Sequence, residues 1–117
     1  MKICIENSNG YADFQRLALD RLLESPVFAL TFDIGHNHGT GHVDESTLLN
    51  HRDKLHHFHF HDAAGRKDHL ALGTGGIDLQ KYFHLASQYG RRIVLETKTV
   101  AGLRQSVEWL KSRAFKV

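Results

Sequence analysis

The sequence predicts an α/β fold with a parallel sheet built from four successive strand–helix units. Short apolar segments alternate with segments of helical periodicity, which is typical of a parallel sheet with right-handed crossovers. Each apolar segment also ends on side chains that can bind a metal ion. Because the carboxyl ends of parallel strands lie at one edge, we expect these side chains to converge there.

The predicted strands are short apolar runs whose polarity pattern shows how each is buried. In the third, Phe58 and Phe60 lie on one face, and His57, His59 and His61 on the other. The second is almost continuously apolar, as expected for a strand covered on both faces. The predicted strands are 2–6, 27–33, 55–61 and 92–97.

Helices are predicted between these strands from apolar spacing and capping residues. Pro26 ends the first helix because proline cannot continue the hydrogen-bond ladder. Asp78 is a predicted N-cap, and Gly90 is the predicted C′ residue of the same helix. Residues 35–43 and 63–76 are predicted to be loops. The predicted helices are 11–24, 45–51, 79–89 and 102–112.

Length and composition indicate one globular domain over residues 1–117, with 41% hydrophobic and 24% charged residues. The net charge of +2 is spread along the chain, so a nucleic-acid partner is not expected. The single Cys4 cannot form an internal disulfide, which fits a cytoplasmic protein. No apolar stretch approaches the roughly 20 residues that span a membrane, so no membrane partner is expected.

Four residues are predicted to bind one divalent cation: Glu6, Asp33, His59 and Glu96. Each lies on the face opposite the bulky apolar residues of its own strand. Three carboxylates and one imidazole favour Mn²⁺, Mg²⁺ or Co²⁺, and are compatible with Zn²⁺. The alternative for any single carboxylate is a solvated loop residue, and Asp33 has the further alternative of capping a turn.

Two other patterns leave alternatives open. His57 and His61 are interpreted as orienting or substrate-side residues, or as polar groups satisfied within the fold. The glycine-rich segment Gly73–Gly76 precedes a helix and has the pattern of a phosphate-binding loop, but a flexible tight turn explains it equally well.

Five motifs in order resemble the xylose isomerase-like barrel superfamily, which includes sugar and sugar-phosphate isomerases and epimerases and endonuclease IV-type enzymes. The resemblance extends over nearly the whole chain and places it at strands five to eight of that barrel. The similar residues are Glu6 (fifth-strand Glu), Asp33 to His36 (Asp-x-x-His), His59 to Asp62 (His-x-x-Asp), the loop Asp68 to Asp78, and Glu96 (eighth-strand Glu).

This resemblance implies a parallel (βα)₄ half-barrel that corresponds to the second half of a TIM barrel. A whole barrel needs roughly 250 residues, and four strands alone leave two unpaired sheet edges. We therefore expect either a homodimer that closes an eight-stranded barrel or a fragment of a longer reading frame.

The resemblance further implies a metal-dependent sugar or sugar-phosphate isomerase or epimerase that acts through an enediolate. Glu6 and Glu96 would be catalytic, exchanging a proton on opposite faces of the reacting carbon. The substrate-binding residues would be His36, His61, His69 and Lys98.

Two alternative functions remain open from the sequence. The chain could be a non-catalytic or truncated half-barrel that binds metal or assembles with a partner. It could also be an endonuclease IV-like phosphodiesterase, although Lys67 stands where the nuclease branch has an aspartate.

Overall fold

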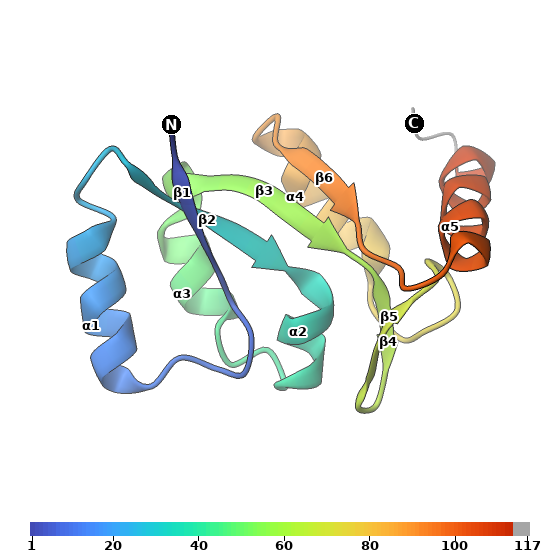
Figure 1. Cartoon of the computed structure of the whole chain (residues 1–117), viewed down its shortest axis with the longest axis horizontal. Coiled ribbons are helices and arrows are strands. Elements are labelled where there is room, and N and C mark those ends of the chain that lie inside the picture. Colours follow the sequence, from blue (N-terminus) through green and yellow to red (C-terminus); the bar gives the residue numbers. More distant parts are fainter. Residues whose placement is uncertain (114–117) are drawn as a thin grey trace.

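The computed structural model describes residues 1–113, which form a four-stranded parallel sheet in the order β1-β2-β3-β6 (Figure 1). The last four residues of the predicted domain lie outside the described residues. The predicted parallel sheet is confirmed, with boundaries within two residues of those expected. Its strands are β1 (Ile3–Glu6), β2 (Phe28–Asp33), β3 (Leu55–Phe60) and β6 (Arg92–Leu95).

The helices follow the expected order. Asp78 accepts a hydrogen bond from the Lys81 amide, and Gly90 has a φ of 60°, so both predicted caps are confirmed. Among residues 1–113, no helix has the length and apolarity needed to cross a bilayer. The helices are α1 (Asp13–Leu22), α2 (Ile34–Gly39), α3 (Glu45–Asn50), α4 (Leu79–Gln88) and α5 (Val100–Ser112), with a 3₁₀ turn at Arg52–Lys54.

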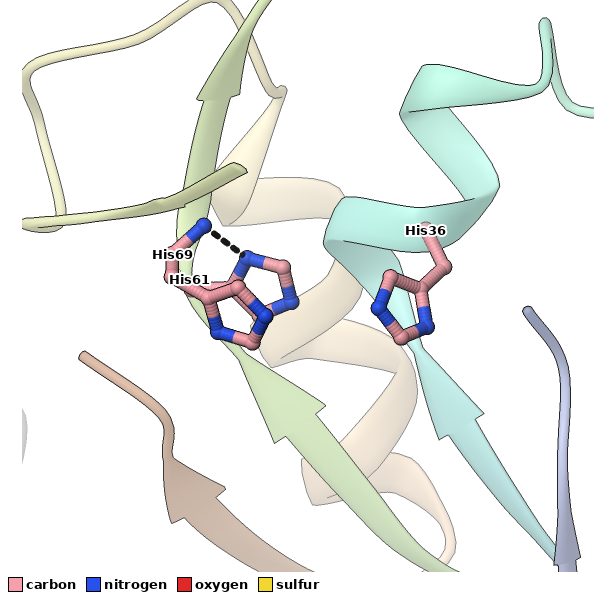
Figure 2. Close-up of side chains that lie close together, drawn as sticks. All are labelled: His36, His61 and His69. Atoms are coloured by element: carbon pink, nitrogen blue, oxygen red, sulfur yellow. Dashed lines mark hydrogen bonds between the residues drawn. The ribbon is translucent and has the colours of Figure 1, made fainter. Parts of the chain in front are cut away.

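The two predicted loops contain regular structure, so that part of the prediction was wrong. Residues 35–43 include most of α2, whose first turn is held by the Asp33 carboxylate accepting from the His36 amide. Residues 63–76 include most of a hairpin of β4 (Asp62–Ala64) and β5 (Lys67–Leu70), which turns at Gly65 with a φ of 60°. Both elements lie beyond the ends of β2 and β3, bringing His36 and His69 close together (Figure 2).

The hydrophobic core lies on one face of the sheet. Phe32 and Phe58 are fully buried and stack with ring centroids 5.5 Å apart, and Tyr82 of α4 packs edge-on against Phe32. Helices α3 and α4 lie behind the sheet in Figure 1 and cover this face. Alternation along β2 and β3 therefore directs Asp33 and His59 away from the helices.

A partly buried polar network ties α2, α3 and α4 together. The Tyr82 hydroxyl donates a 2.6 Å hydrogen bond to Glu45 Oε1, and the Asn37 side-chain amide donates to the same oxygen at 3.2 Å. Lys81 Nζ binds the other oxygen of Glu45 at 3.0 Å. Burial opposes ionisation of Glu45, but the hydrogen bonds from Tyr82 and Lys81 outweigh it and lower the Glu45 pKa.

Replacing Tyr82 with phenylalanine tests this network. Loss of a hydrogen bond to a buried charged group should lower the free energy of unfolding by about 1–3 kcal/mol at neutral pH. A lowered folded-state pKa contributes stability above the unfolded pKa, and this contribution is lost as the pH falls through the folded pKa. The difference between wild type and Tyr82→Phe should therefore shrink in acid, as measured by urea unfolding. A difference that does not change with pH would contradict this role for Glu45.

Candidate metal centre

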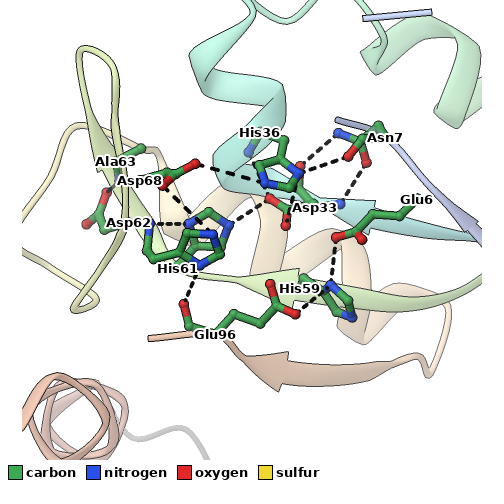
Figure 3. Close-up of polar contacts among 11 residues, drawn as sticks. Glu6, Asn7, Asp33, His36, His59, His61, Asp62, Ala63, Asp68 and Glu96 are labelled. Atoms are coloured by element: carbon green, nitrogen blue, oxygen red, sulfur yellow. Dashed lines mark hydrogen bonds and ion pairs between the residues drawn. The ribbon is translucent and has the colours of Figure 1, made fainter. Parts of the chain in front are cut away.

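The four predicted metal ligands meet at the carboxyl ends of the strands. Each of Glu6, Asp33, His59 and Glu96 offers a nitrogen or oxygen atom, and these atoms lie within 4.8 Å of one another (Figure 3). His59 Nδ1 lies 2.8 Å from Glu6 Oε1 and 3.0 Å from Glu96 Oε1. Parallel pairing causes this, because Asp33 is in register with His59, and the Glu96 amide donates to the Phe60 carbonyl.

Asp33 is the most firmly held member of the cluster. The Asn7 side chain brackets its backbone, donating to the Asp33 carbonyl at 3.0 Å and accepting from the Asp33 amide at 2.8 Å. Its Oδ1 accepts from the His36 amide and from His61 Nε2, both at 2.8 Å. Its Oδ2 is buried and has no hydrogen-bond partner among residues 1–113, although His36 Nδ1 lies 3.4 Å away.

The surroundings shift the pKa values of Glu6 and Asp33 in opposite directions. Burial and the neighbouring Asp33 carboxyl raise the Glu6 pKa, in spite of the opposing effect of His59. Burial also disfavours the charged form of Asp33, but hydrogen bonds from His61 and the His36 amide outweigh it and lower the Asp33 pKa. Asp33 is thus suited to carry a constant negative charge, and Glu6 to exchange a proton.

The chemistry of the cluster fits one divalent cation. Three carboxyl groups lie in a small space, and a buried oxygen of Asp33 has no donor in the described part of the chain. A cation would relieve both the repulsion and the unsatisfied acceptor. Oxygen-dominated ligands with one imidazole suit Mn²⁺, Mg²⁺, Co²⁺ or Zn²⁺. Glu6, Asp33, His59 and Glu96 are the residues that would hold it.

His61 lies behind Asp33, which favours the orienting interpretation of this residue over the predicted contact with substrate. The His61 ring is fully buried, and its Nδ1 accepts a 2.7 Å hydrogen bond from the His69 amide (Figure 2). That nitrogen therefore carries no proton, and the proton of the neutral ring lies on Nε2, which donates to Asp33. Both His61 nitrogens make hydrogen bonds within the protein, so contact with a metal or a sugar would require one of these bonds to break.

The other predicted substrate-binding residues differ in their placement. His36 and His69 are partly exposed beside the cluster, with Nδ1 atoms at 3.0 Å from the Asn7 carbonyl and 3.1 Å from the Glu96 carbonyl, respectively. Their roles stay predictions. Lys98 is exposed and makes no hydrogen bond or ion pair within the described chain, so the structure does not connect it to the cluster.

The glycine-rich segment Gly73–Gly76 folds around the carboxylate of Asp62. Asp62 accepts hydrogen bonds from the amides of Ala63, Gly73 and Ile77 at 2.9 to 3.2 Å. A Cβ on Gly75 would overlap Asp62, so the loop closes tightly around this side chain. This arrangement favours the tight-turn interpretation over a phosphate-binding loop.

Two residues that support the site were not singled out from the sequence. Asn7 was interpreted only as part of a turn cluster, yet it is fully buried and joins the ends of β1 and β2. Gly35 is in contact with the His61 ring, which any side chain would displace. In the sequence, the one available signal was a glycine two residues after the end of an apolar strand, because glycine allows another side chain to approach closely.

Gly35→Ala tests whether His61 must occupy its present position. The added methyl group would overlap the His61 ring, and overpacking of this kind costs about 1–3 kcal/mol. We expect lower stability in urea unfolding and weaker Mn²⁺ binding by calorimetry, because the Asp33 carboxylate loses its support. The matched control is Gly39→Ala in the same helix, where a Cβ meets nothing within 4 Å. Equal behaviour of the two variants would contradict the positioning role.

Comparison with solved structures finds the same fold in larger enzymes. D-Allulose 3-epimerase from Methylomonas sp. matches with a TM-score of 0.67 and 19% identity, over 97% of this chain and 49% of that chain. The 3-keto-D-glucoside 4-epimerase of E. coli matches with a TM-score of 0.67 and 18% identity, over 95% and 46%. The probable 3-DHS dehydratase of Bacillus anthracis matches with a TM-score of 0.72 and 13% identity, over 100% and 50%.

These similarities show a shared fold, in which the chain spans about half the length of each matched structure. The half-barrel expected from the resemblance is therefore confirmed. No curated protein sequence matches the chain significantly. The family model for the xylose isomerase-like TIM barrel matches residues 1–113. The chain belongs to the xylose isomerase-like TIM barrel family.

Proposed function

We propose that this chain carries the catalytic half of a metal-dependent sugar isomerase or epimerase. The observation that supports it most is the meeting of Glu6 and Glu96 at His59 Nδ1, beside the anchored Asp33 carboxylate. Two matched structures are named as sugar epimerases, which supports a ketose or related sugar as substrate. A cation bound by these four residues would supply Lewis-acid stabilisation of negative charge on substrate oxygen atoms.

Proton transfer is the task of the two glutamates. Both contact His59 Nδ1, and they come from opposite edges of the sheet, which favours approach to a sugar carbon from two sides. One carboxylate takes the proton from the carbon beside the carbonyl, which leaves an enediolate. Return of a proton to the opposite face gives the epimer, and return to the neighbouring carbon gives the isomer. The raised pKa of Glu6 suits such an exchange.

Glu96→Gln should reduce proton exchange from a ketose in deuterated water by about 100-fold or more, because it removes a general base. The measurement is NMR of deuterium incorporation over a ketose panel with Mn²⁺ or Mg²⁺ present. The control is Glu108→Gln, the same change on α5, where the glutamate is exposed and lies 3.9 Å from Lys111. Circular dichroism should show both variants folded.

The outcomes separate this proposal from its main alternative. Wild-type exchange that Glu96→Gln retains would remove Glu96 from the mechanism. Tight metal binding without exchange from any ketose would favour the non-catalytic half-barrel, which the half-length match also supports.

We also propose that a second copy of the chain closes the barrel. Strands β1 and β6 each have one neighbour in the sheet, and both edges carry exposed apolar side chains. Ile3 and the α1 residues Phe14 and Leu17 are 46%, 71% and 68% exposed, beside a 220 Å³ apolar groove between β1 and α1. Val94 and Leu103 at the β6–α5 edge are 46% and 43% exposed. Pairing of β1 with β6 of a second copy, at both edges, would bury these side chains.

Light scattering of the purified protein tests this closure, with a dimer as the expected result. Phe14→Glu should shift the protein to monomer, because a charge would enter the apolar edge. Ser46→Glu introduces the same charge at an exposed position of α3, which connects the two inner strands β2 and β3, and should remain dimeric. A stable wild-type monomer would overturn the proposal.

A further inference from the structure

A pocket of about 270 Å³, lined in part by polar side chains, opens beside the candidate metal centre. Three segments wall it: the loop after β1, helix α2 and the tip of the β4–β5 hairpin. The side chains that line it include Ser8, Asn9, His36, Thr40, Arg66 and Lys67. The pocket has room for several functional groups, since a water molecule takes up ~30 Å³ in the liquid.

The pocket wall carries two positive side chains, Arg66 and Lys67, and one negative side chain, Asp68. Arg66 and Lys67 make no ion pair or hydrogen bond through their side chains within residues 1–113, and the same holds for the side chains of Ser8 and Asn9. One carboxylate, Asp68, also lines the pocket, but it lies 4.0 Å from His36 Nε2 and 3.8 Å from His69 Nε2 (Figure 3). Two cations and two neutral polar side chains are therefore available to a ligand.

His36 connects this pocket to the metal centre. The residue lines the pocket, and its Nδ1 lies 3.4 Å from Asp33 Oδ2, the buried oxygen that lacks a hydrogen bond. A substrate whose reacting carbons lie between Glu6 and Glu96 can thus extend past His36 to the hairpin tip. Arginine and lysine side chains beside free hydroxyl and amide groups suit a phosphate or a carboxylate.

We infer that the pocket at Ser8, Asn9, Arg66 and Lys67 binds an anionic substituent of the substrate, a phosphate or a carboxylate. The inference rests on the proposed function, because it identifies the substrate as a sugar derivative that carries negative charge at the end remote from the reacting carbons. The β4–β5 hairpin then serves to hold the side chains of Arg66 and Lys67 beside α2.

Calorimetry of the full chain with inorganic phosphate and with acetate tests the inference. A chelator is present, so that neither anion binds through a metal ion. We expect binding of at least one anion, weakened about 10-fold or more in the double variant Arg66→Gln/Lys67→Gln, which removes both charges. Arg104→Gln, on exposed α5, removes a charge of the same kind and should bind like wild type. Tighter binding of phosphate identifies a phosphorylated substrate, and tighter binding of acetate a carboxylated one.

Two outcomes would overturn the subsite: no binding of either anion, or equal loss in the double variant and in Arg104→Gln. Deuterium exchange from an uncharged ketose and from its phosphate ester is measured in parallel. Exchange without anion binding at Arg66 and Lys67 refutes the subsite and leaves the proposed function standing. Anion binding that depends on both residues, with no exchange from any sugar, supports the subsite and refutes the proposed function.

Discussion

The mutual repulsion of carboxyl groups at the ends of the strands is the constraint around which this half-barrel is organised. Glu6, Asp33 and Glu96 come together because the parallel sheet aligns the ends of β1, β2 and β6 around His59. Like charges at this distance disfavour one another's ionisation. Burial is the main cause of the raised Glu6 pKa, and the neighbouring Asp33 carboxyl adds to it. Such an arrangement costs stability in the absence of a cation, so its support has to come from the surrounding residues.

That support is concentrated on Asp33. Asn7 holds its backbone, α2 begins on its carboxylate, and His61 donates to the same oxygen from beneath. The bare glycine at position 35 leaves the space that the His61 ring fills. Among residues 1–113, one oxygen of Asp33 is thereby saturated and the other has no donor, an arrangement that suits a metal ligand.

Alternation along the strands made much of the site predictable. Because Phe58 and Phe60 must face the helices, His59 has to face the other way, and the same reasoning applies to Asp33 between its apolar neighbours. The supporting residues were not predictable, because their roles depend on contacts across the chain. The tautomer of His61 is set by the amide of His69, eight residues later in the chain. His69 lies on a hairpin that was predicted from the sequence to be a loop. Helix α2 contains two glycines and three polar side chains, so local propensity gave no sign of it.

The β4–β5 hairpin touches both ends of the proposed substrate site, and this has an energetic consequence. Through its His69 amide it supports the His61 ring next to Asp33, and at its tip it carries the positively charged side chains of Arg66 and Lys67. An anion that draws the tip toward α2 would also alter the support of Asp33. Linkage is reciprocal, so the affinity for the metal and the affinity for the anion would then change by the same factor. The hairpin would make the two ligands cooperative, and the cation would be held most tightly when a complete substrate is bound.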